Sequence, residues 1–370
     1  MKKTVLLLAL ICLLQPKIIF GQGSTAIRTA ANFLSITPDA RAAGMSDVGV
    51  ATTADANAQH WNVAKYIFAE SNAGISLSYT PWMRHYVNDI NLGYLSGYYK
   101  FDENQSFSAS LRFLSNGNVY VRNDLEQLQL TNNANELAFD LGYSRRLSDK
   151  FSAGIELRYI RTISGAEQGK ALFASGFAGD IGVYYQSPLS LFNNPSTLAF
   201  GLNISNIGTK IKNNNDNSYF LPTNLRLGGN ITMNINKNHQ LSVAADINKL
   251  MVPSPTINED GTVNSNADKS MLGGLFSSFG DADGGFKEEL KEIAFGIGIE
   301  YKYLKTFAVR GGFFYEDTQK GMRRYFTFGG GYSFKVITLD VSYLSTYSGI
   351  NHPLDNTLRL TLSVNLSALK

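Results

Sequence analysis

The most regular feature of the chain is a strict alternation of apolar and polar side chains near its end. Between residues 358 and 366 every second position is aliphatic, and the positions between them are Arg359, Thr361, Ser363 and Asn365. Side chains of a β-strand point alternately to its two faces, so this segment predicts a strand with one aliphatic face and one polar face.

The same alternation recurs along the chain and predicts fourteen strands. Their expected ranges are 75–80, 89–98, 106–114, 135–144, 151–161, 177–185, 197–205, 224–233, 240–247, 293–301, 306–315, 325–334, 336–344 and 357–366. An even number of strands, most of them roughly nine to eleven residues long, is typical of bacterial transmembrane β-barrels. The composition, with 23 Phe, 19 Tyr, 34 Gly and only 9 Pro, could also belong to a soluble sandwich, so the arrangement of connections and charges has to decide between the two.

The connections between the predicted strands differ in length by parity. Those after even-numbered strands are mostly short, at 102–105, 147–150, 235–239 and 302–305, although 187–196 is longer and contains two prolines. Those after odd-numbered strands tend to be long, at 116–134, 207–223 and 248–292. Short periplasmic turns and long outer loops are the asymmetry of outer-membrane barrels, and this asymmetry predicts that both termini lie in the periplasm.

Charged side chains avoid the apolar face of the predicted strands. The inward face contains twelve charges: Arg112, Glu136, Asp140, Glu156, Arg158, Asp180, Arg226, Asp246, Glu300, Arg310, Asp340 and Arg359. A basic residue facing lipid at the midplane costs about 2–4 kcal/mol, so this segregation favours a membrane barrel. Arg161 breaks the parity, but it lies near the expected outer rim. The mixed signs predict a lumen charge network of Arg112, Glu156, Arg158, Arg226, Glu300, Arg310, Asp340 and Arg359, in which Arg359 pairs with a lumen acid.

The first residues have the features of a secretory signal. Lys2 and Lys3 precede an apolar run at 5–14, and residues 20–22 offer a cleavage site, so we predict a signal peptide at 1–21. The single cysteine, Cys12, lies inside this run without the small residues of a lipoprotein site. The leader's three lysines account for the excess of 33 basic over 30 acidic residues, so the exported chain is neutral and gives no argument for a nucleic-acid partner.

Little in the sequence predicts catalysis, a cofactor or a metal. The histidines, which could in principle serve a surface hydrolase, lack zinc-ligand spacing and a nucleophile motif; they are His60, His85, His239 and His352. Residues 281–284 resemble the start of a calcium loop, but the remaining ligand spacing does not follow. Glycines at 296, 298 and 329–331 fall inside strand patterns, where they favour close approach of another backbone.

Two segments fall outside the barrel pattern. Residues 22–72 precede the barrel (73–370) and are long enough to fold into the lumen as a plug, or else to form a periplasmic tail. The connection 248–292 is long enough to be functional or disordered. Its apolar cluster predicts either a partner-binding surface or a lid over the barrel mouth; the cluster consists of Met271, Leu272, Leu275, Phe276 and Phe279.

Several N-terminal motifs resemble the PorV family of outer-membrane proteins. They are FLSITPDARA at 33–42, MSDVGVAT at 45–52, HWNVAK at 60–65, PWMR at 81–84 and DINL at 89–92. The chain departs from the family pattern at two positions. The family usually has Met-Gly-Asp where this chain has Met45-Ser46-Asp47, and Asn-Pro-Ala where this chain has Asn62-Val63-Ala64. The plug residues that the motifs single out are Phe33, Pro38, Asp39, Arg41, Asp47, Trp61 and Asn62.

The resemblance implies a fourteen-stranded barrel like that of the FadL transporters and a role in the type IX secretion system. PorV-like proteins associate with the large translocon barrel of that system, bind the C-terminal signal domain of exported cargo, and deliver it to the machinery that removes the signal and attaches the cargo. The alternative is a FadL-like channel for hydrophobic small molecules, gated by the plug. Both place the protein in the outer membrane of a Gram-negative bacterium, in contact with its lipid.

Overall fold

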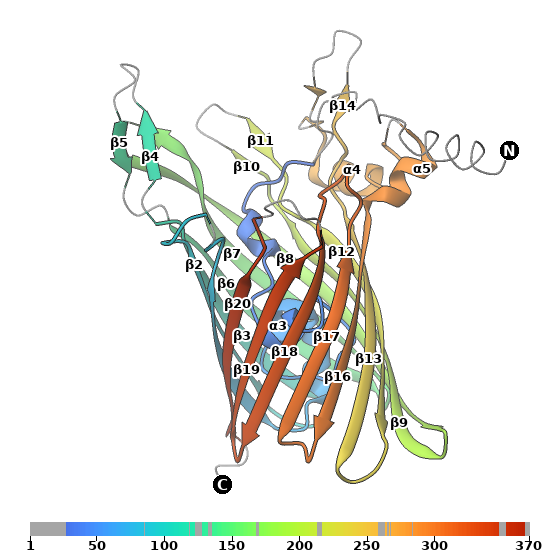
Figure 1. The fold of residues 1–370 in the computed structure, drawn as a ribbon. Helices are drawn as coiled ribbons and strands as arrows, with labels where there is room; N and C mark the ends of the chain where they lie inside the picture. Colours follow the sequence, from blue (N-terminus) through green and yellow to red (C-terminus); the bar gives the residue numbers. More distant parts are fainter. Residues whose placement is uncertain are drawn as a thin grey trace, which may run out of the picture.

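The chain forms a closed antiparallel β-barrel of fourteen strands in the computed structural model (Figure 1). The structure describes residues 27–84, 86–117, 119–122, 128–131, 135–167, 170–212, 217–257, 263–264, 266, 268–282, 284–347 and 353–366. The strands of the barrel wall, in order, are β1 (Ala73–Pro81), β2 (Asn91–Lys100), β3 (Gln105–Ser115), β6 (Asn135–Ser148), β7 (Phe151–Glu167), β8 (Lys170–Leu191), β9 (Asn194–Gly208), β12 (Asn224–Asn234), β13 (His239–Leu250), β16 (Ile293–Tyr303), β17 (Phe307–Tyr315), β18 (Arg324–Phe334), β19 (Ile337–Thr346) and β20 (Thr357–Asn365).

The barrel closes between its first and last strands. Leu77 of β1 lies opposite Leu362 of β20, and the pairing is antiparallel like every other pairing in the wall. The predicted fourteen-stranded membrane barrel is confirmed. Closure removes the free first and last edges of the wall, whose backbone groups lipid could not satisfy with hydrogen bonds.

The alternation along β20 separates the two faces of the wall. Leu358, Leu360 and Leu362 are 39–44% exposed on the outside, whereas Arg359 and Thr361 are at most 2% exposed on the inside. Arg161, which breaks this parity, lies at the outer surface of β7 with its guanidinium 4.0 Å from the centre of the Phe173 ring.

We name the two ends of the barrel by their connections. The turn end has the connections β2–β3, β6–β7, β8–β9, β12–β13, β16–β17 and β18–β19, and the loop end has the remaining connections. Additional two-stranded sheets belong to the loop-end connections and were not among the predicted strands: β4 (Val119–Arg122) with β5 (Leu128–Thr131), β10 (Ile211–Lys212) with β11 (Ser218–Tyr219), and β14 (Thr256–Ile257) with β15 (Val263–Asn264).

One predicted turn is instead an extension of two strands. β8 and β9 continue past the expected ends at 185 and 197 and form a projecting hairpin at the turn end (Figure 1). The two residues at its tip, Phe192 and Asn193, have φ of 51° and 62°, the left-handed geometry of a tight hairpin turn. Pro188 is tolerated because this part of β8 lies beyond the neighbouring strand β7.

The segment before β1 lies inside the barrel (Figure 1). It contains short helical turns η1 (Asn32–Ser35), α2 (Ala40–Ala43), α3 (Ala58–Trp61) and η2 (Val63–Phe68). Its beginning lies at the loop end, where the Ala30 N–H donates to the Phe220 carbonyl at 2.8 Å. Its end lies at the turn end, where Lys100 donates to the Ala69 carbonyl at 2.9 Å.

The described beginning and end of the chain therefore lie at opposite ends of the barrel. Both termini are expected on one side from strand counting, but that count ignores a segment that runs the length of the lumen. The predicted signal peptide at 1–21 lies outside the described residues.

The loop 248–292 contains α4 (Met271–Ser277), α5 (Phe286–Glu289) and η3 (Leu290–Glu292). Among the described residues, none of the helices has the length and apolar character needed to span a bilayer.

Candidate functional site

The N-terminal segment is bound to β13 through a carboxylate that the strand presents inward. Asp246 accepts hydrogen bonds from the backbone N–H groups of Gly49 (2.7 Å) and Val50 (3.0 Å). Lys65, which is 1% exposed, donates to the Gly49 carbonyl at 2.6 Å. Neither Asp246 nor Lys65 is among the predicted site residues. Alternation did place Asp246 inward, and Lys65 ends one of the PorV-like motifs.

A second attachment joins α2 to β16 and β17. Arg41 donates to Glu300 at 2.9 Å and to Asp55 of its own segment at 2.8 Å. Glu300 also accepts from Arg310 at 2.7 Å, and Arg310 pairs with Asp340 at 2.7 Å. Sequence reasoning placed Glu300, Arg310 and Asp340 in one network, and the structure adds Arg41 to it from the N-terminal segment.

Polar contacts also organise the segment internally. Asp39 caps α2 by accepting from the Ala42 N–H at 2.9 Å, and its other oxygen accepts from the Trp61 indole N–H at 2.7 Å. Asn62 donates to the Val183 carbonyl of β8 at 2.9 Å. Pro38, which precedes Asp39, is buried. These motif residues hold two distant parts of the segment together and fix them to the wall.

One of the two departures from the family pattern, Ser46, lies in a sharp bend after α2. Ser46 and Asp47 have φ of 59° and 61°, in the left-handed region that glycine adopts most readily. The family's Met-Gly-Asp supplies glycine at the first of these positions. Here Ser46 is held in place by two contacts of 2.9 Å with the Thr327 hydroxyl, one from its N–H and one from its own hydroxyl.

Two lumen arginines bind backbone carbonyls of the segment. Arg112 donates to the carbonyls of Phe33 (3.0 Å) and Leu34 (2.6 Å). Arg359 donates to the carbonyl of Thr37 at 3.1 Å. The expectation that Arg359 pairs with a lumen acid is therefore wrong for the described residues, because a backbone carbonyl takes that position.

Arg158 is the centre of a separate charge cluster on β6, β7 and β8. It pairs with Asp140 at 2.6 Å, with Asp180 at 3.2 Å, and with Glu156 on its own strand. Glu156 also accepts from Gln59 of the N-terminal segment at 2.8 Å. The cluster binds three strands and the segment to one another.

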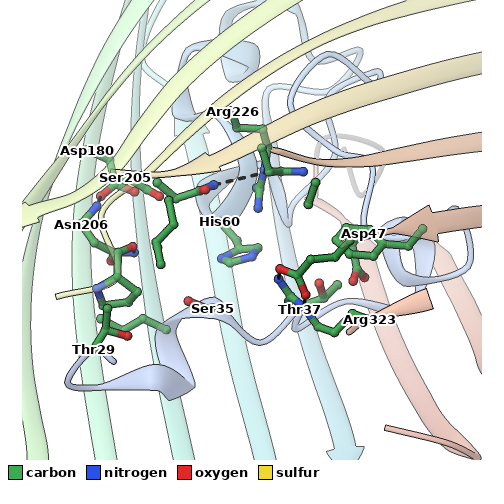
Figure 2. A pocket seen from close by; sticks show the side chains of 18 of the residues that line it. Thr29, Ser35, Thr37, Asp47, His60, Asp180, Ser205, Asn206, Arg226 and Arg323 are labelled. Atoms are coloured by element: carbon green, nitrogen blue, oxygen red, sulfur yellow. Dashed lines mark hydrogen bonds and ion pairs between the residues drawn. The ribbon is translucent and has the colours of Figure 1, made fainter. Parts of the chain in front are cut away.

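The lumen retains a cavity of about 180 Å³ on the loop side of the segment (Figure 2). Arg226 lies at its border, donates to the Asn248 side chain at 2.7 Å, and has its guanidinium carbon 4.6 Å from the centre of the Trp61 ring. His60 and Asp47 also line the cavity, and Asp47 accepts a hydrogen bond from Tyr325. A second cavity of about 470 Å³ opens on the turn side, and its lining includes Arg41 and other charged or polar groups.

Glycines of the wall allow the segment to approach closely. A Cβ placed on Gly298 would lie 2.5 Å from the Met45 Cβ, and one on Gly296 would lie 2.6 Å from the Ser46 carbonyl oxygen. No side chain fits at these distances. Gly329 likewise lies against Gly44, as expected for glycines placed inside strand patterns.

The residues considered for catalysis or metal binding are not brought together. His60 lies in the lumen, His239 contacts Tyr301 near the turn end, and His85 and His352 lie outside the described residues. Asp281 accepts from the Ser254 N–H at 3.2 Å, while Asp283 lies outside the described residues. Within the described ranges, no group of three His, Cys, Asp or Glu side chains could hold a metal ion.

The apolar cluster of the loop 248–292 divides into buried and exposed members. Leu275 is 8% exposed and Met271 is partly exposed, whereas Leu272, Phe276 and Phe279 are 57%, 71% and 48% exposed. Two further exposed residues follow in and after α5, where the helical pattern is too short to identify from sequence. We call the resulting surface the loop patch: Leu272, Phe276, Phe279, Phe286 and Leu290.

An ion-pair clamp fixes this loop to the barrel rim. Lys249 at the end of β13 pairs with Glu292 at 2.7 Å and Glu289 at 3.0 Å. Lys320, in the β17–β18 connection, pairs with Glu288 at 2.7 Å and Glu292 at 3.0 Å. The hydrogen bond from Lys320 is the main cause that lowers the pKa of Glu288. Burial alone would raise the pKa of Glu292, but hydrogen bonds from both lysines outweigh it and the pKa is lowered.

Solved barrels of similar shape show the fold alone. A monoaromatic hydrocarbon channel, TodX with the deltaS2S3 mutation, is 12% identical with a TM-score of 0.53 and covers 88% of this chain and 97% of its own. The deltaS2 mutant of TodX is 14% identical with a TM-score of 0.51, covering 88% and 96%. A Pseudomonas aeruginosa FadL homologue is 11% identical with a TM-score of 0.44, covering 89% and 98%.

Sequence comparison gives a more specific result. No curated protein matches the chain. Residues 21–257 match the family described as type IX secretion system protein PorV. This range contains the N-terminal segment with its attachments at Arg41, Asp246 and Asn62. It also contains the motifs at 33–65 that carry the resemblance. Because the match spans well over half of the sequence, the chain belongs to the PorV family of the type IX secretion system.

Proposed function

We propose that this protein is a non-enzymatic carrier in type IX secretion at the outer membrane. In this role it associates with the translocon barrel, binds the C-terminal signal domain of exported cargo, and delivers the cargo for signal removal and surface attachment or release. Membership of the PorV family supports the proposal, and the loop patch supplies the observation specific to this chain.

The loop patch fits a partner-binding surface better than a lid. Phe276 and Phe286 are 71% and 77% exposed, whereas a lid would bury them against its own barrel. The clamp from Lys249 and Lys320 holds the loop in place, which reduces the entropy lost on binding. Exposed aromatic anchors on a rigid support are typical of binding hot spots.

We place the turn end in the periplasm and the loop end outside the cell, because short turns face the periplasm in barrels of this class. The end of β20 is then periplasmic, while the first described residues, near Ala30, lie at the outer end. In this arrangement the N-terminal segment is a plug that closes the lumen.

The test is replacement of Phe276 and Phe279 by Ser. Barrel assembly, followed by heat-modifiable mobility in gels, should be unchanged because neither residue belongs to the wall. Co-purification of the translocon barrel should fall at least tenfold, and cargo attachment should fall with it. The control replaces Tyr86 and Val87, which are 48% and 39% exposed in the β1–β2 connection, with Ser. Parental secretion and co-purification in the Phe276/Phe279 variant would show that the patch is not the interface.

A channel for hydrophobic small molecules is the second candidate, because the fold resembles monoaromatic hydrocarbon channels. The lumen favours the first proposal. Its cavities are bordered by charged groups such as Arg226 and Arg41, which would have to be desolvated by an apolar solute. Uptake of toluene by liposomes containing the purified protein, at a rate above that of empty liposomes, would favour the channel.

A further inference from the structure

The loop-side cavity of about 180 Å³ is lined mainly by polar and charged side chains (Figure 2). Seven of the lining residues carry a formal charge: Asp47, Arg158, Asp180, Arg226, Glu292, Glu316 and Arg323. Five of these seven form ion pairs, either with one another or with the lysines of the clamp. The other two, Arg226 and Asp47, have opposite charges, and neither has an ion-pair partner in the part of the chain that the structure describes.

Arg226 has an unpartnered edge of its guanidinium at this cavity. Its Nε–H donates to the Asn248 side chain at 2.7 Å, and its guanidinium carbon lies 4.6 Å from the centre of the Trp61 ring. Trp61 is held in turn by Asp39, which accepts from the indole N–H at 2.7 Å. These contacts orient the guanidinium, while its Nη1 and Nη2 atoms have no acceptor among the described residues. Those two atoms form the fork that binds a carboxylate with two parallel hydrogen bonds.

Asp47 and His60 border the same space as Arg226 (Figure 2). The Asp47 Oδ2 atom accepts from the Tyr325 hydroxyl, whereas its buried Oδ1 atom has no donor among the described residues. The His60 Nδ1 atom lies 2.7 Å from Nη2 of Arg112, which can only donate, so Nδ1 is the acceptor and Nε2 carries the hydrogen. This buried Nε2–H also has no acceptor within the described ranges. The cavity therefore combines an unpaired cation, an unpaired carboxylate oxygen and one neutral donor.

The size of the cavity and its two unpaired charges define the chemistry of a ligand. A cavity of about 150 Å³ holds one benzene molecule, so about 180 Å³ suits a molecule of roughly six to eight non-hydrogen atoms. Water can hydrogen-bond to these groups, but it has no charge with which to pair Arg226 or Asp47. Unpaired charges away from bulk water are costly, so a ligand that pairs both gains more than a ligand that pairs one. A free amino acid has this size and carries a carboxylate and an ammonium group on the same carbon atom.

We propose that the loop-side cavity is a binding site for a small free amino acid. The carboxylate of the amino acid binds the Nη1–Nη2 fork of Arg226 and accepts from the Nε2–H of His60, while its ammonium group donates to Oδ1 of Asp47. The side chain of Arg323, at the border of the cavity, is 40% exposed, so the ligand reaches the site from the loop end. This inference goes beyond the proposed function, because it involves neither the loop patch nor the translocon barrel.

Isothermal titration calorimetry on the purified full-length protein in detergent tests the site, with L-alanine as the probe. We expect saturable binding of one L-alanine per barrel. L-lactate has the same shape but a hydroxyl group in place of the ammonium, and it should bind at least tenfold more weakly. The emission of Trp61 should titrate with the same affinity in a Trp82→Phe protein, in which Trp61 is the single tryptophan. No saturable binding of L-alanine, or equal binding of L-lactate, would overturn the proposal.

Variants assign the two charges to their roles. Arg226→Gln should weaken the binding of L-alanine at least tenfold. Asp47→Asn should remove the preference for L-alanine over L-lactate, and asparagine is compatible with the left-handed φ of 61° at this position. The control replaces both Arg323 and Glu316, which pair with each other at 2.7 Å, with Gln and should change the affinity less than twofold.

Heat-modifiable mobility in gels shows which of these variants assemble. Unchanged affinity in an assembled Arg226→Gln protein, or an equal loss of affinity in the control, would show that the fork of Arg226 does not bind the ligand. The comparison of the two probes on the parent protein decides the proposal even where a variant fails to assemble.

Discussion

Glu300 is one of the residues through which the barrel wall holds the N-terminal segment. Its Oε1 accepts from Arg41 of the segment, and its Oε2 accepts from both Arg41 and Arg310 of β17. Both arginines are buried, so removal of the carboxylate would leave two like charges without their shared partner. Arg41 would retain Asp55 and Arg310 would retain Asp340, so the cost should be smaller than the roughly 3–5 kcal/mol of a buried charge that is left with no partner.

Glu300 and Arg310 should therefore be energetically coupled. We expect Glu300→Ala to destabilise the barrel more than Arg310→Ala, because Glu300 keeps Arg41 when Arg310 is lost. The double variant should be less destabilised than the sum of the two by about 0.5–3 kcal/mol. Equilibrium unfolding in denaturant, with the protein in lipid bilayers, measures the three values. Additive losses would mean that the pair is not coupled.

Alternation predicted the face of Arg359 but not its partner. Its Nε–H donates to the carbonyl of Thr37, which is 322 residues away along the chain. Side-chain patterns contain no information about a backbone carbonyl in an irregular segment. The same limit applies to Asp246, whose partners are two backbone N–H groups. The face of a charge follows from local sequence, whereas its partner follows from the path of the segment.

Among the elements, the N-terminal segment and the wall are matched in shape. Gly298 on β16 and Gly312 on β17 both lie against Met45, so the wall has no side chains where the segment is closest. The strand pattern singled out Gly298 in the sequence, but not Gly312. It did not indicate which part of the segment lies against them, because short irregular turns such as α2 have no periodicity to read.

Gly298→Leu should displace the segment without preventing strand pairing. The added side chain requires the space of Met45, so we expect a larger single-channel conductance in planar bilayers than for the parent protein. Gly311→Leu, on the outer face of β17 with only the Thr327 carbonyl within 4 Å (3.8 Å), is the control and should leave conductance unchanged. If both variants and the parent conduct equally, the contact between Gly298 and Met45 is not what keeps the lumen closed.

The clamp at the barrel rim should make the order of the loop 248–292 depend on pH. The pKa values of Glu288 and Glu292 are lowered, so their contribution is complete above their ordinary value of 4.5 and is lost as pH falls below it. Burial would lower the pKa of Lys320, but its hydrogen bonds to these carboxylates raise it. The lysine's contribution is therefore complete below 10.5 and lost at more alkaline pH.

Hydrogen exchange across the loop measures this dependence. We expect strong protection of α5 from about pH 5 to pH 10 and a loss of protection on either side. Lys320→Met should weaken the protection of the α5 amides at pH 7, while the amides of the barrel strands remain protected. A loop with equal exchange in the variant and the parent would show that the clamp does not order it.

For the whole molecule, the wall was largely predictable because a barrel in lipid imposes the same two-residue period on every strand. The predicted ranges differ from the structure mainly at β7, β8 and β9, which continue past the residues in which the alternation is regular. The small loop-end sheets such as β4–β5 are also absent from the prediction, because strands of two to four residues are too short to show a distinctive periodicity.

The lipid-facing surface gives a prediction for the complete barrel. Leu360 lies on the outer face near the closing seam, between Tyr79 of β1 and Val341 of β19. Leu360→Lys should lower the free energy of unfolding by about 2–4 kcal/mol, because the charge faces the hydrocarbon near mid-strand. Leu360→Ala is the control and should cost less. Stability equal to that of the alanine variant would place this face outside the lipid.

The path of the N-terminal segment also limits the order in which the protein can fold. Ala40 donates to the Thr361 hydroxyl across 321 positions of sequence, and Ser46 to Thr327 across 281. The residues that leave the export machinery first therefore find these partners only when the last strands have arrived. Until then the segment's buried polar groups, among them Arg41, must remain hydrated or be shielded by another protein. The final strands complete the wall and the binding site of the segment in the same step.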